Sequence, residues 1–412
     1  MAIDVVALRA HFPSLAHGLA FFDGPGGTQT PTPVAEAVIR TMTAPLSNRG
    51  QVSASERNAE EAVAGFRAAY ADLLGVPETG VVHGRSATQL TYDFSRTLAT
   101  GWRPGDEIVL SRLDHDANVR PWVQAAERAG VVVRWIEIDA GTAELDLGSY
   151  ERALSPRTRL VAVTAASNVL GTLPPVRRIA DLAHEAGALV FVDGVHYAAH
   201  HLVDVPALGA DLFVCSPYKF LGPHCGVLAG SPDVLDTLVP DKLLPSPDTV
   251  PERFEFGTLP YEILAGASAA VDFLAALDPD ERERPGAPGD TPGTPATRRE
   301  RLARSLRSLH EHENAVRARV EEGLRALGDA VTVHSRAKDR TPTVLMSFAG
   351  RDAREAQAHL AARGVVAPAG SFYAYEAFTM LELADPALRV GIAPYNDTGD
   401  VDRLLDGLGS FL

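Results

Sequence analysis

The chain has 412 residues, of which 46% are hydrophobic and 22% charged, and its formal net charge is −15 at pH 7. This length can form a large domain with its own core and a smaller second one. The negative charge argues against nucleic acid and anionic membranes as partners, and no apolar run approaches the roughly 20 residues that span a bilayer. The N-terminus lacks the pattern of a secretory signal, and Cys215 and Cys225 form neither a disulfide framework nor a metal motif. We therefore expect a cytoplasmic protein without a metal site.

The first residues and the long segment after them are predicted to belong to different parts of the fold. Residues 1–25 are expected to form an N-terminal arm that packs with a small domain, and residues 26–277 a large domain. Here runs rich in β-branched residues alternate with helical patterns such as 175–187, which ends at a glycine as many helices do. Strands that are apolar on both faces and separated by helices predict a mainly parallel sheet covered by helices. The strand segments are 106–113, 131–138, 158–167, 187–194 and 210–216.

The composition changes after residue 277. Residues 278–298 are rich in Pro, Gly and charge and are predicted to be a surface loop insertion. A long helical pattern follows at 298–328, and residues 299–412 as a whole are expected to form a smaller α+β domain. The predicted fold class is therefore α/β, with a large domain built on a mainly parallel sheet and a small C-terminal domain.

Polar residues stand at or just after the ends of the apolar strands, where ligands gather in parallel sheets. Asp193 ends the run "VFVD", and His196 follows it in "VHYAAHH". Asp193 is interpreted either as the cap of the next turn or as the partner of a protonated heterocycle. Lys219 lies in the apolar, Gly- and Pro-rich stretch "CSPYKFLGPHCG". It is either a lysine whose amine reaches solvent or a Schiff-base lysine kept partly neutral by its surroundings.

These motifs resemble those of one family. "VDGVH" followed by "SPYKFLGP" is similar to the pyridoxal phosphate signature of the fold-type I, class V aminotransferases, in the cysteine desulfurase-like branch. The resemblance covers nearly the whole chain and implies that family's fold and cofactor. Further matching segments are "FFDGPGGTQTP" (21–31), "HGRSATQL" (83–90), "LDHDANVRPW" (113–122), "SNVLGTLPP" (167–175), "FEFGTLP" (254–260) and "RVGIAPYN" (389–396).

The resemblance implies a role for each matching residue. Lys219 would bind the cofactor aldehyde and move the substrate's Cα proton, while Asp193 would keep the pyridine nitrogen protonated. His196 and Asn168 would contact the O3′ side of the ring or the substrate. Arg389, which taken alone reads as a surface ion pair, would hold the substrate carboxylate. The other implied cofactor contacts are the amides of Ala87 and Thr88 at a helix start, the hydroxyls of Ser216 and Tyr218, and Thr258 reaching the neighbouring subunit of a homodimer.

Two segments depart from the pattern of the cysteine desulfurases. Those enzymes place a histidine over the ring in a "HHAN" segment, whereas this chain has "HDAN", with Asp116 at the histidine's place. An aspartate cannot stack on a ring, so the contact is made either by His115 or by neither residue. Those enzymes also carry a cysteine on a mobile loop of the small domain. The matching stretch here, 365–378, has none, and Tyr373 falls at the nucleophile's place. A reactive role for Cys225 is the weaker reading, and Cys215 is expected to be a core residue.

The function expected from these residues is a carbon–sulfur lyase that acts on cysteine or an S-substituted cysteine by β-elimination, since elimination needs no protein thiol. An aminotransferase or an amino-acid epimerase of the same family is the alternative. An epimerase would need a second base, for which Tyr373 or His196 is the candidate. A cofactor-binding protein without catalysis is a third reading. A nucleotide-binding α/β protein is the weakest, because the chain lacks both Gly-rich phosphate-binding motifs.

Overall fold

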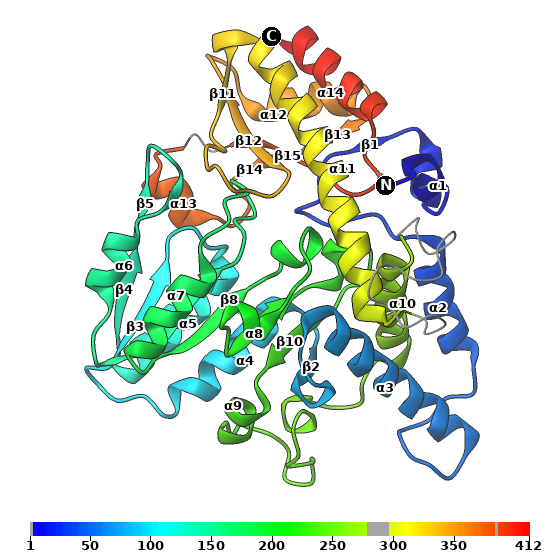
Figure 1. Ribbon diagram of the computed structural model, residues 1–412, viewed down its shortest axis with the longest axis vertical. Coiled ribbons are helices and arrows are strands. Elements are labelled where there is room, and N and C mark those ends of the chain that lie inside the picture. The colour runs from blue at the N-terminus through cyan, green and yellow to red at the C-terminus, as the bar shows by residue number, and fades with distance from the viewer. Residues whose placement is uncertain (1–2, 278–295, 384–385) are drawn as a thin grey trace.

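The computed structural model describes residues 3–277, 296–383 and 386–412 (Figure 1). The loop insertion expected at 278–298 falls, up to residue 295, outside the described residues. A seven-stranded sheet forms the centre of a larger unit, at the bottom of Figure 1, and a four-stranded sheet that of a smaller unit above it. The architecture is thus α/β, as the alternation of strand and helix patterns predicts.

The seven-stranded sheet has the order β2-β10-β9-β8-β7-β3-β4. β10 is antiparallel to both of its neighbours, and the other adjacent pairs are parallel. The mainly parallel sheet expected from the sequence is therefore confirmed, although β2 and β10, short and flanked by glycine, are not among the predicted strands. The bounds are β2 Val81–Gly84, β3 Glu107–Ser111, β4 Val132–Ile136, β7 Thr158–Thr164, β8 Leu189–Asp193, β9 Leu212–Cys215 and β10 Gly226–Gly230.

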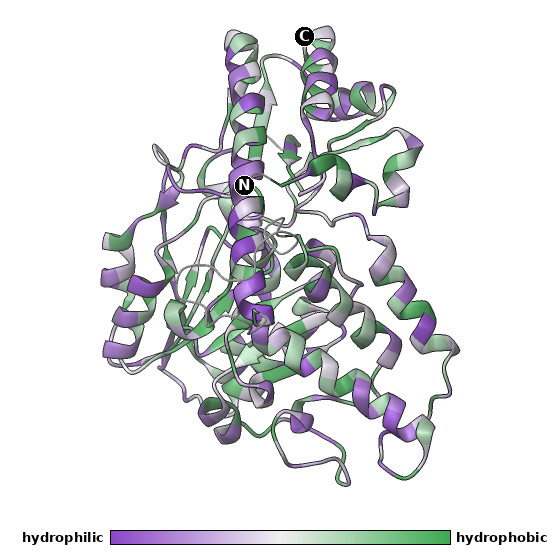
Figure 2. Cartoon of the chain, turned by 45° about the vertical axis from the view of Figure 1, so that its right-hand side comes forward, coloured by the Kyte–Doolittle hydropathy of each residue, from purple (hydrophilic) through white to green (hydrophobic). Residues whose placement is uncertain are grey.

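Alternate residues of the central strands belong to two apolar clusters, one on each face of the sheet. Val161 and Val163 of β7 pack on one side with α3, α7 and α10, and Leu160 and Ala162 on the other with α4 and α5. Because helices cover both faces, the strands are apolar at consecutive positions, and they are green in Figure 2. The helices of this unit are α2 Thr32–Thr43, α3 Ala54–Leu74, α4 Ala87–Ala99, α5 Arg120–Ala129, α6 Leu147–Ala153, α7 Val176–Glu185, α8 Val205–Leu208, α9 Pro232–Thr237 and α10 Tyr261–Ala275.

The long helix α11 (Arg298–Ala326) joins the two units, and begins at a capping box formed by Thr297 and Glu300. Its first half, including Leu306, packs in the core of the larger unit, whereas Val320 in its second half packs in the core of the smaller one. Figure 1 shows α11 running from one unit to the other, and in Figure 2 its surface alternates between purple and green. A shared helix of this kind fixes how the two sheets face each other.

The smaller unit is built on the antiparallel sheet β11-β12-β15-β14. Near the N-terminus, after α1 (Val5–Arg9), the strand β1 (Ala20–Phe21) pairs in parallel with β13 (Val365–Val366), so the start of the chain joins this unit. A separate hairpin in the larger unit pairs β5 (Ile138–Asp139) with β6 (Glu144–Leu145). The remaining bounds are β11 Val331–Val333, β12 Thr343–Phe348, α12 Ala353–Ala361, β14 Ala369–Gly370, α13 Tyr375–Met380, β15 Ala387–Gly391 and α14 Thr398–Phe411.

Candidate active site

A cavity of about 390 Å³ lies where the carboxyl ends of β7, β8 and β9 meet segments of the smaller unit. Parallel strands bring their carboxyl ends to one edge of a sheet, which is why residues far apart in the sequence converge here. The structure brings together all of the site residues predicted from the sequence except Thr258, which is exposed and outside the cavity of this chain. Those that line it are Ala87, Thr88, Asn168, Asp193, His196, Ser216, Tyr218, Lys219, Tyr373 and Arg389.

Asp193 is the last residue of β8, and its side chain points into the cavity. The residue is 7% exposed, and one carboxylate oxygen, Oδ1, accepts a hydrogen bond of 2.9 Å from the amide of Val195. Burial raises the pKa of Asp193 to about 6, and the Val195 hydrogen bond and the charge of Lys219 offset only part of this effect. A buried carboxylate in such a position is stabilised by a cationic partner from a ligand.

Lys219 ends the short helix that follows β9, at Pro217–Lys219. Its amine donates a hydrogen bond to the carbonyl oxygen of Pro25 and lies 5.0 Å from the ring centre of Tyr218. Burial lowers the pKa of Lys219 to about 8, with a further lowering by Arg389, whereas Asp23 and Asp193 act in the opposite direction. A lysine with this pKa has an appreciable neutral fraction at pH 7, which a nucleophilic amine requires.

Three buried polar atoms at the cavity have no hydrogen-bond partner among the described residues: Asn168 Oδ1, His196 Nδ1 and Arg389 Nε. His196 is held through its other nitrogen, which lies 2.9 Å and 3.0 Å from the hydroxyls of Thr341 and Thr343. Burial lowers the pKa of His196 well below its usual value, so the ring is neutral. Buried polar groups are normally paired, and the three atoms therefore indicate that a polar ligand completes this site.

The N-terminus of α4 faces the same cavity. Ser86 caps this helix by accepting a hydrogen bond of 3.1 Å from the amide of Gln89, which leaves the amides of Ala87 and Thr88 without helical partners. The helix start packs directly on β10, since a Cβ atom at Gly226 would lie 2.4 Å from the carbonyl carbon of Ser86. Free amides and the positive end of a helix dipole at a cavity wall favour a phosphate or another anion.

Arg389, on β15 of the smaller unit, closes the opposite side of the cavity. Its Nη2 donates to Asp23 Oδ1 over 2.6 Å, and its Nη1 to the carbonyl oxygen of Asn168 over 3.1 Å. The guanidinium carbon also lies 3.9 Å from the ring centre of Phe372. The residue is 3% exposed, so it is a buried cation at the cavity and not the surface ion pair that its sequence context alone suggests.

The segment 371–375 contributes two lining residues to the cavity in an unusual backbone conformation. Phe372 and Tyr373 have φ values of 53° and 55°, which is unusual for residues other than glycine. Two hydrogen bonds hold them, from Asn168 Nδ2 to the Phe372 carbonyl oxygen (3.0 Å) and from the Asp116 amide to the Tyr373 carbonyl oxygen (2.7 Å). Backbone strain persists only where the surroundings enforce it, so this segment is pinned against the larger unit.

His115 and Asp116, the first two residues of the segment "HDAN", lie in different places. The His115 side chain lines the cavity, with its ring centre 5.5 Å from that of Tyr373. Asp116 lies outside this cavity and pairs with Arg120 at 3.0 Å. Burial lowers the pKa of His115 to about 4, so its ring is neutral and available for contact with a flat ligand. His115 therefore lies at the cavity wall, where it could make the ring contact that the sequence assigns either to His115 or to neither residue.

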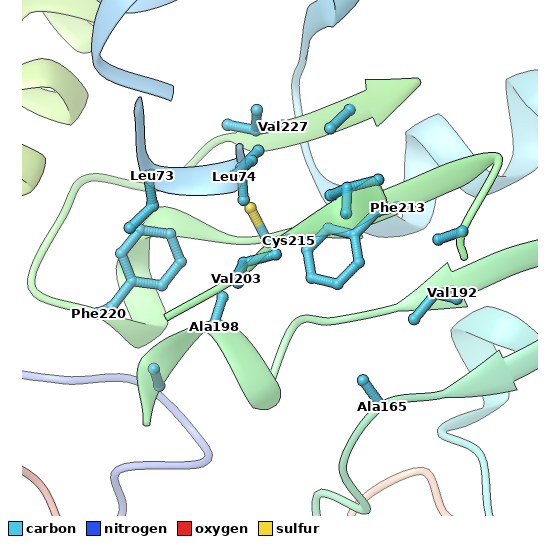
Figure 3. Packing of buried hydrophobic residues seen from close by; sticks show 14 of the residues in the cluster. Leu73, Leu74, Ala165, Val192, Ala198, Val203, Phe213, Cys215, Phe220 and Val227 are labelled. Atoms are coloured by element: carbon cyan, nitrogen blue, oxygen red, sulfur yellow. The ribbon is translucent and has the colours of Figure 1, made fainter. Parts of the chain in front are cut away.

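Both cysteines lie in the apolar core. Cys215 and Cys225 are 0% and 2% exposed, and neither lines the cavity. Figure 3 shows the Cys215 sulfur surrounded by apolar side chains such as Val203 and Phe213. Burial raises the pKa of the Cys225 thiol to about 12 and that of Cys215 well above its usual value. Because the thiolate is the nucleophile, neither cysteine is suited to attack sulfur.

Several cavity residues are not among those predicted from the sequence. Asp23 stands in the quoted segment "FFDGPGG", and Phe372 next to the predicted Tyr373, but neither has a neighbouring motif that assigns it a role. Both are brought to the cavity by the smaller unit, through the pairing of β1 and β13 and through the pinned segment. The other additional lining residues are Pro25, Gly26, Ser86, Thr91, Ala117, Thr164, Ala166, Val195 and Pro368.

Neither a metal-binding group nor a membrane-spanning helix is found among the described residues. Among residues 3–277, 296–383 and 386–412, no group of three or more His, Cys, Asp or Glu side chains is arranged to hold a metal ion. Within the same residues, no helix combines the length and the hydropathy that crossing a bilayer requires.

Comparisons with known proteins show the family to which this chain is related. The family model for aminotransferase class-V matches residues 20–286 and 303–404. The chain is 32% identical to the uncharacterized protein MT3887 of Mycobacterium tuberculosis over 100% of each chain. It is also 32% identical to a probable cysteine desulfurase of Pseudomonas aeruginosa, over 96% of this chain and 95% of that one. The crystal structure of cysteine desulfurase CsdA from Escherichia coli, in an S-sulfonic acid form, matches with a TM-score of 0.83 at 25% identity, covering 99% of this chain and 98% of that one.

The match spans both units, and it confirms the fold and the family that the sequence motifs predict. The cavity fits the cofactor of that family. It has a lysine and an aspartate at neighbouring strand ends, a helix start suited to a phosphate, and an arginine on the opposite side. The chain therefore belongs to the aminotransferase class-V family and is a pyridoxal phosphate-dependent enzyme of its cysteine desulfurase-like branch.

Proposed function

We propose that this enzyme is a carbon–sulfur lyase that converts cysteine or an S-substituted cysteine, with one water, into pyruvate, ammonia and a thiol. One observation carries the proposal: the cavity is lined by a lysine and a buried arginine, yet its described lining residues include no cysteine. The two cysteines of the chain are both buried elsewhere. A reaction in which the sulfur leaves without attack by a protein thiol fits this set of residues.

The cofactor would be held by the residues at the strand ends and at the start of α4. Lys219 would bind its aldehyde carbon, Asp193 its ring nitrogen, and the amides of Ala87 and Thr88 its phosphate, together with the hydroxyls of Ser216 and Tyr218. The unpartnered His196 Nδ1 and Asn168 Oδ1 offer further contacts to the ring or the substrate. When bound, pyridoxal phosphate supplies an electron sink that makes the Cα proton of an amino acid acidic.

Three residues of the chain would then have separate roles in the reaction. Arg389 holds the substrate carboxylate, with its guanidinium kept flat against Phe372. Lys219 removes the Cα proton, which its lowered pKa favours near neutral pH. Asp193 keeps a proton on the ring nitrogen by remaining ionised beside it. The sulfur leaves Cβ with the bonding electron pair and takes a proton from water, so that no protein thiol is consumed.

The pinned segment 371–375 supports elimination over desulfuration. A loop that carries sulfur must move between the substrate and an acceptor, whereas Phe372 and Tyr373 are tied to Asn168 and Asp116 by hydrogen bonds. In this position Tyr373 offers a hydroxyl and an aromatic face, neither of which can hold a persulfide. This segment would instead limit the entry of water to the cavity.

We also propose a cytoplasmic homodimer. Thr258 is exposed and lies outside the cavity of its own chain. The segment 254–260 is the one that, in the resemblance described above, reaches the neighbouring subunit. Phe256 in this segment is 48% exposed, which suits a contact with a second copy.

Product analysis tests the proposed reaction. The cofactor-loaded enzyme would be given cysteine and a panel of S-substituted cysteines without a keto acid, and we expect pyruvate and the corresponding thiol in equal amounts over many turnovers. Alanine together with protein-bound sulfur would overturn the proposal in favour of desulfuration. Substrate returned with inverted configuration would indicate an epimerase, and turnover that appears only after a keto acid is added would indicate an aminotransferase.

The pH dependence of cofactor uptake gives a second prediction. With a pKa of about 8, roughly a tenth of Lys219 is neutral at pH 7, against fewer than about one in a thousand for an ordinary lysine. We therefore expect the rate at which the cofactor-free enzyme binds pyridoxal phosphate covalently to rise about tenfold per pH unit below pH 8 and to level off above it. Stopped-flow absorbance measures this rate. A rate that still rises steeply at pH 10 would contradict the lowered pKa.

A further inference from the structure

The hydrogen bonds of Arg389 already use both of its terminal nitrogens. Nη2 donates to Asp23 Oδ1 at 2.6 Å, Nη1 donates to the Asn168 carbonyl oxygen at 3.1 Å, and Phe372 covers one face. Nε is the nitrogen that is buried without a partner. A planar carboxylate binds an arginine most strongly through N–H groups on two adjacent nitrogens. Both such pairs, Nε with Nη2 and Nη1 with Nη2, include the Nη2 that already donates to Asp23.

Asp23 is held at this place by the backbone. It forms a parallel bridge with Gly391, two residues after Arg389, and the amide of Gly24 donates to the Gly391 carbonyl oxygen at 3.3 Å. On its other side a Cβ atom at Gly26 would lie 2.1 Å from Asp23 Oδ2, so this glycine leaves room for the carboxylate. The Asp23 side chain is 34% exposed and lines the cavity, whereas that of Arg389 is 4% exposed.

We infer that Asp23 takes the place of the substrate carboxylate on Arg389 in the free enzyme, and that the substrate must displace it to bind through two hydrogen bonds. Asp23 is thereby a specificity-determining residue, because it sets how strongly the site favours an amino acid over an analogue without a carboxylate. This inference rests on the role proposed above for Arg389. Asp23 would compete with the substrate carboxylate for Arg389, and none of the sequence motifs indicates this role.

The charges explain the direction of the effect. Arg389 and Asp23 together are neutral, so the free site attracts an anion only weakly. Removing the Asp23 charge leaves a buried cation without its counter-ion, a costly arrangement that an incoming carboxylate relieves. Anion binding should therefore strengthen in Asp23→Asn, whereas binding of a neutral ligand of the same shape should not change.

Propionate and propionamide test this inference. Both lack an amine and cannot react with the cofactor aldehyde, and they differ only in the charged end. Their dissociation constants would be measured by calorimetry on the cofactor-loaded wild type, on Asp23→Asn and on Asp116→Asn. The last variant is the matched control, because it removes a carboxylate from an arginine pair outside the cavity.

We expect Asp23→Asn to bind propionate about tenfold more tightly than the wild type does, a change of about 1.4 kcal/mol, with propionamide unchanged and Asp116→Asn behaving as wild type. Equal or weaker propionate binding, or the same change for both ligands, would overturn the inference. If Asp23→Asn does not fold, as judged by circular dichroism, Asp23→Ser carries the same test. Failure of the proposed lyase reaction would appear in the product analysis and would leave these binding constants unaffected.

Discussion

Replacing Lys219 with alanine is expected to lower turnover by on the order of 10⁴-fold, the upper range for the loss of a general base. The variant loses both the amine that binds the cofactor aldehyde and the base that moves the Cα proton. It should nevertheless fold, since the lysine makes one hydrogen bond, to the Pro25 carbonyl oxygen, and its charged form is disfavoured by burial. Non-covalent binding of the cofactor should survive, because the contacts to its phosphate and ring nitrogen are unchanged.

Absorbance spectroscopy and steady-state assays check this expectation. On addition of an amino acid, the wild type should show a shift of the cofactor band within the mixing time, and Lys219→Ala should show none on that scale. Lys242→Ala is the matched control, because Lys242 pairs with Asp248 away from the cavity. A Lys219→Ala enzyme that exchanges amino acids at the wild-type rate would contradict the assignment of this lysine.

Asp193→Asn is expected to lower the activity of the enzyme and to raise the stability of its cofactor-free form above pH 6. An amide cannot hold a proton on the ring nitrogen, and the loss of one such electrostatic contact lowers rates by about 10²- to 10³-fold. In the cofactor-free enzyme, however, the carboxyl has a pKa of about 6 when folded, against about 3.9 when unfolded. A raised pKa means that ionising Asp193 costs folding free energy, on the order of 2–3 kcal/mol once the pH is well above 6.

The sign of the stability change follows from these two pKa values. Below about pH 4 the carboxyl is protonated in both states, and the variant and the wild type should be equally stable. As the pH rises from 4 through 6, the wild type loses stability and the variant does not. Urea unfolding of the two cofactor-free proteins at pH 4.5 and 7.5 would measure this difference. A variant that is less stable than the wild type at pH 7.5 would show that the carboxylate is stabilised in the folded chain.

The sequence patterns predict the larger sheet well because its strands are buried on both faces. Runs such as 158–167 and 187–194 correspond to β7 and β8 to within three residues at each end. β10 is not predicted, since its five residues begin and end with glycine, which is depleted in strands. The long pattern at 298–328 predicts α11 but not its division between two cores, which depends on which other segments it packs against.

The cavity residues that were predicted follow strand ends or a helix start, where position along the chain implies position in space. Those that were not predicted depend on tertiary contacts. Asp23 reaches Arg389 only because residues before and after it pair with the smaller unit, and His115 rather than Asp116 faces the cavity because of the turn that these residues form. Side-chain direction in a turn cannot be read from a motif, which explains why a ring contact by His115 stayed open.

The most direct test of the account is the set of products that an enzyme without cysteines forms from L-cysteine. Cys215→Ala/Cys225→Ala removes both thiols of the chain, and both lie in the core away from the cavity. If the sulfur leaves by elimination, this enzyme should release pyruvate and sulfide at close to the wild-type rate, provided that it folds as the wild type does. Loss of turnover in the folded variant, or alanine as the product of the wild type, would contradict a reaction that needs no protein thiol.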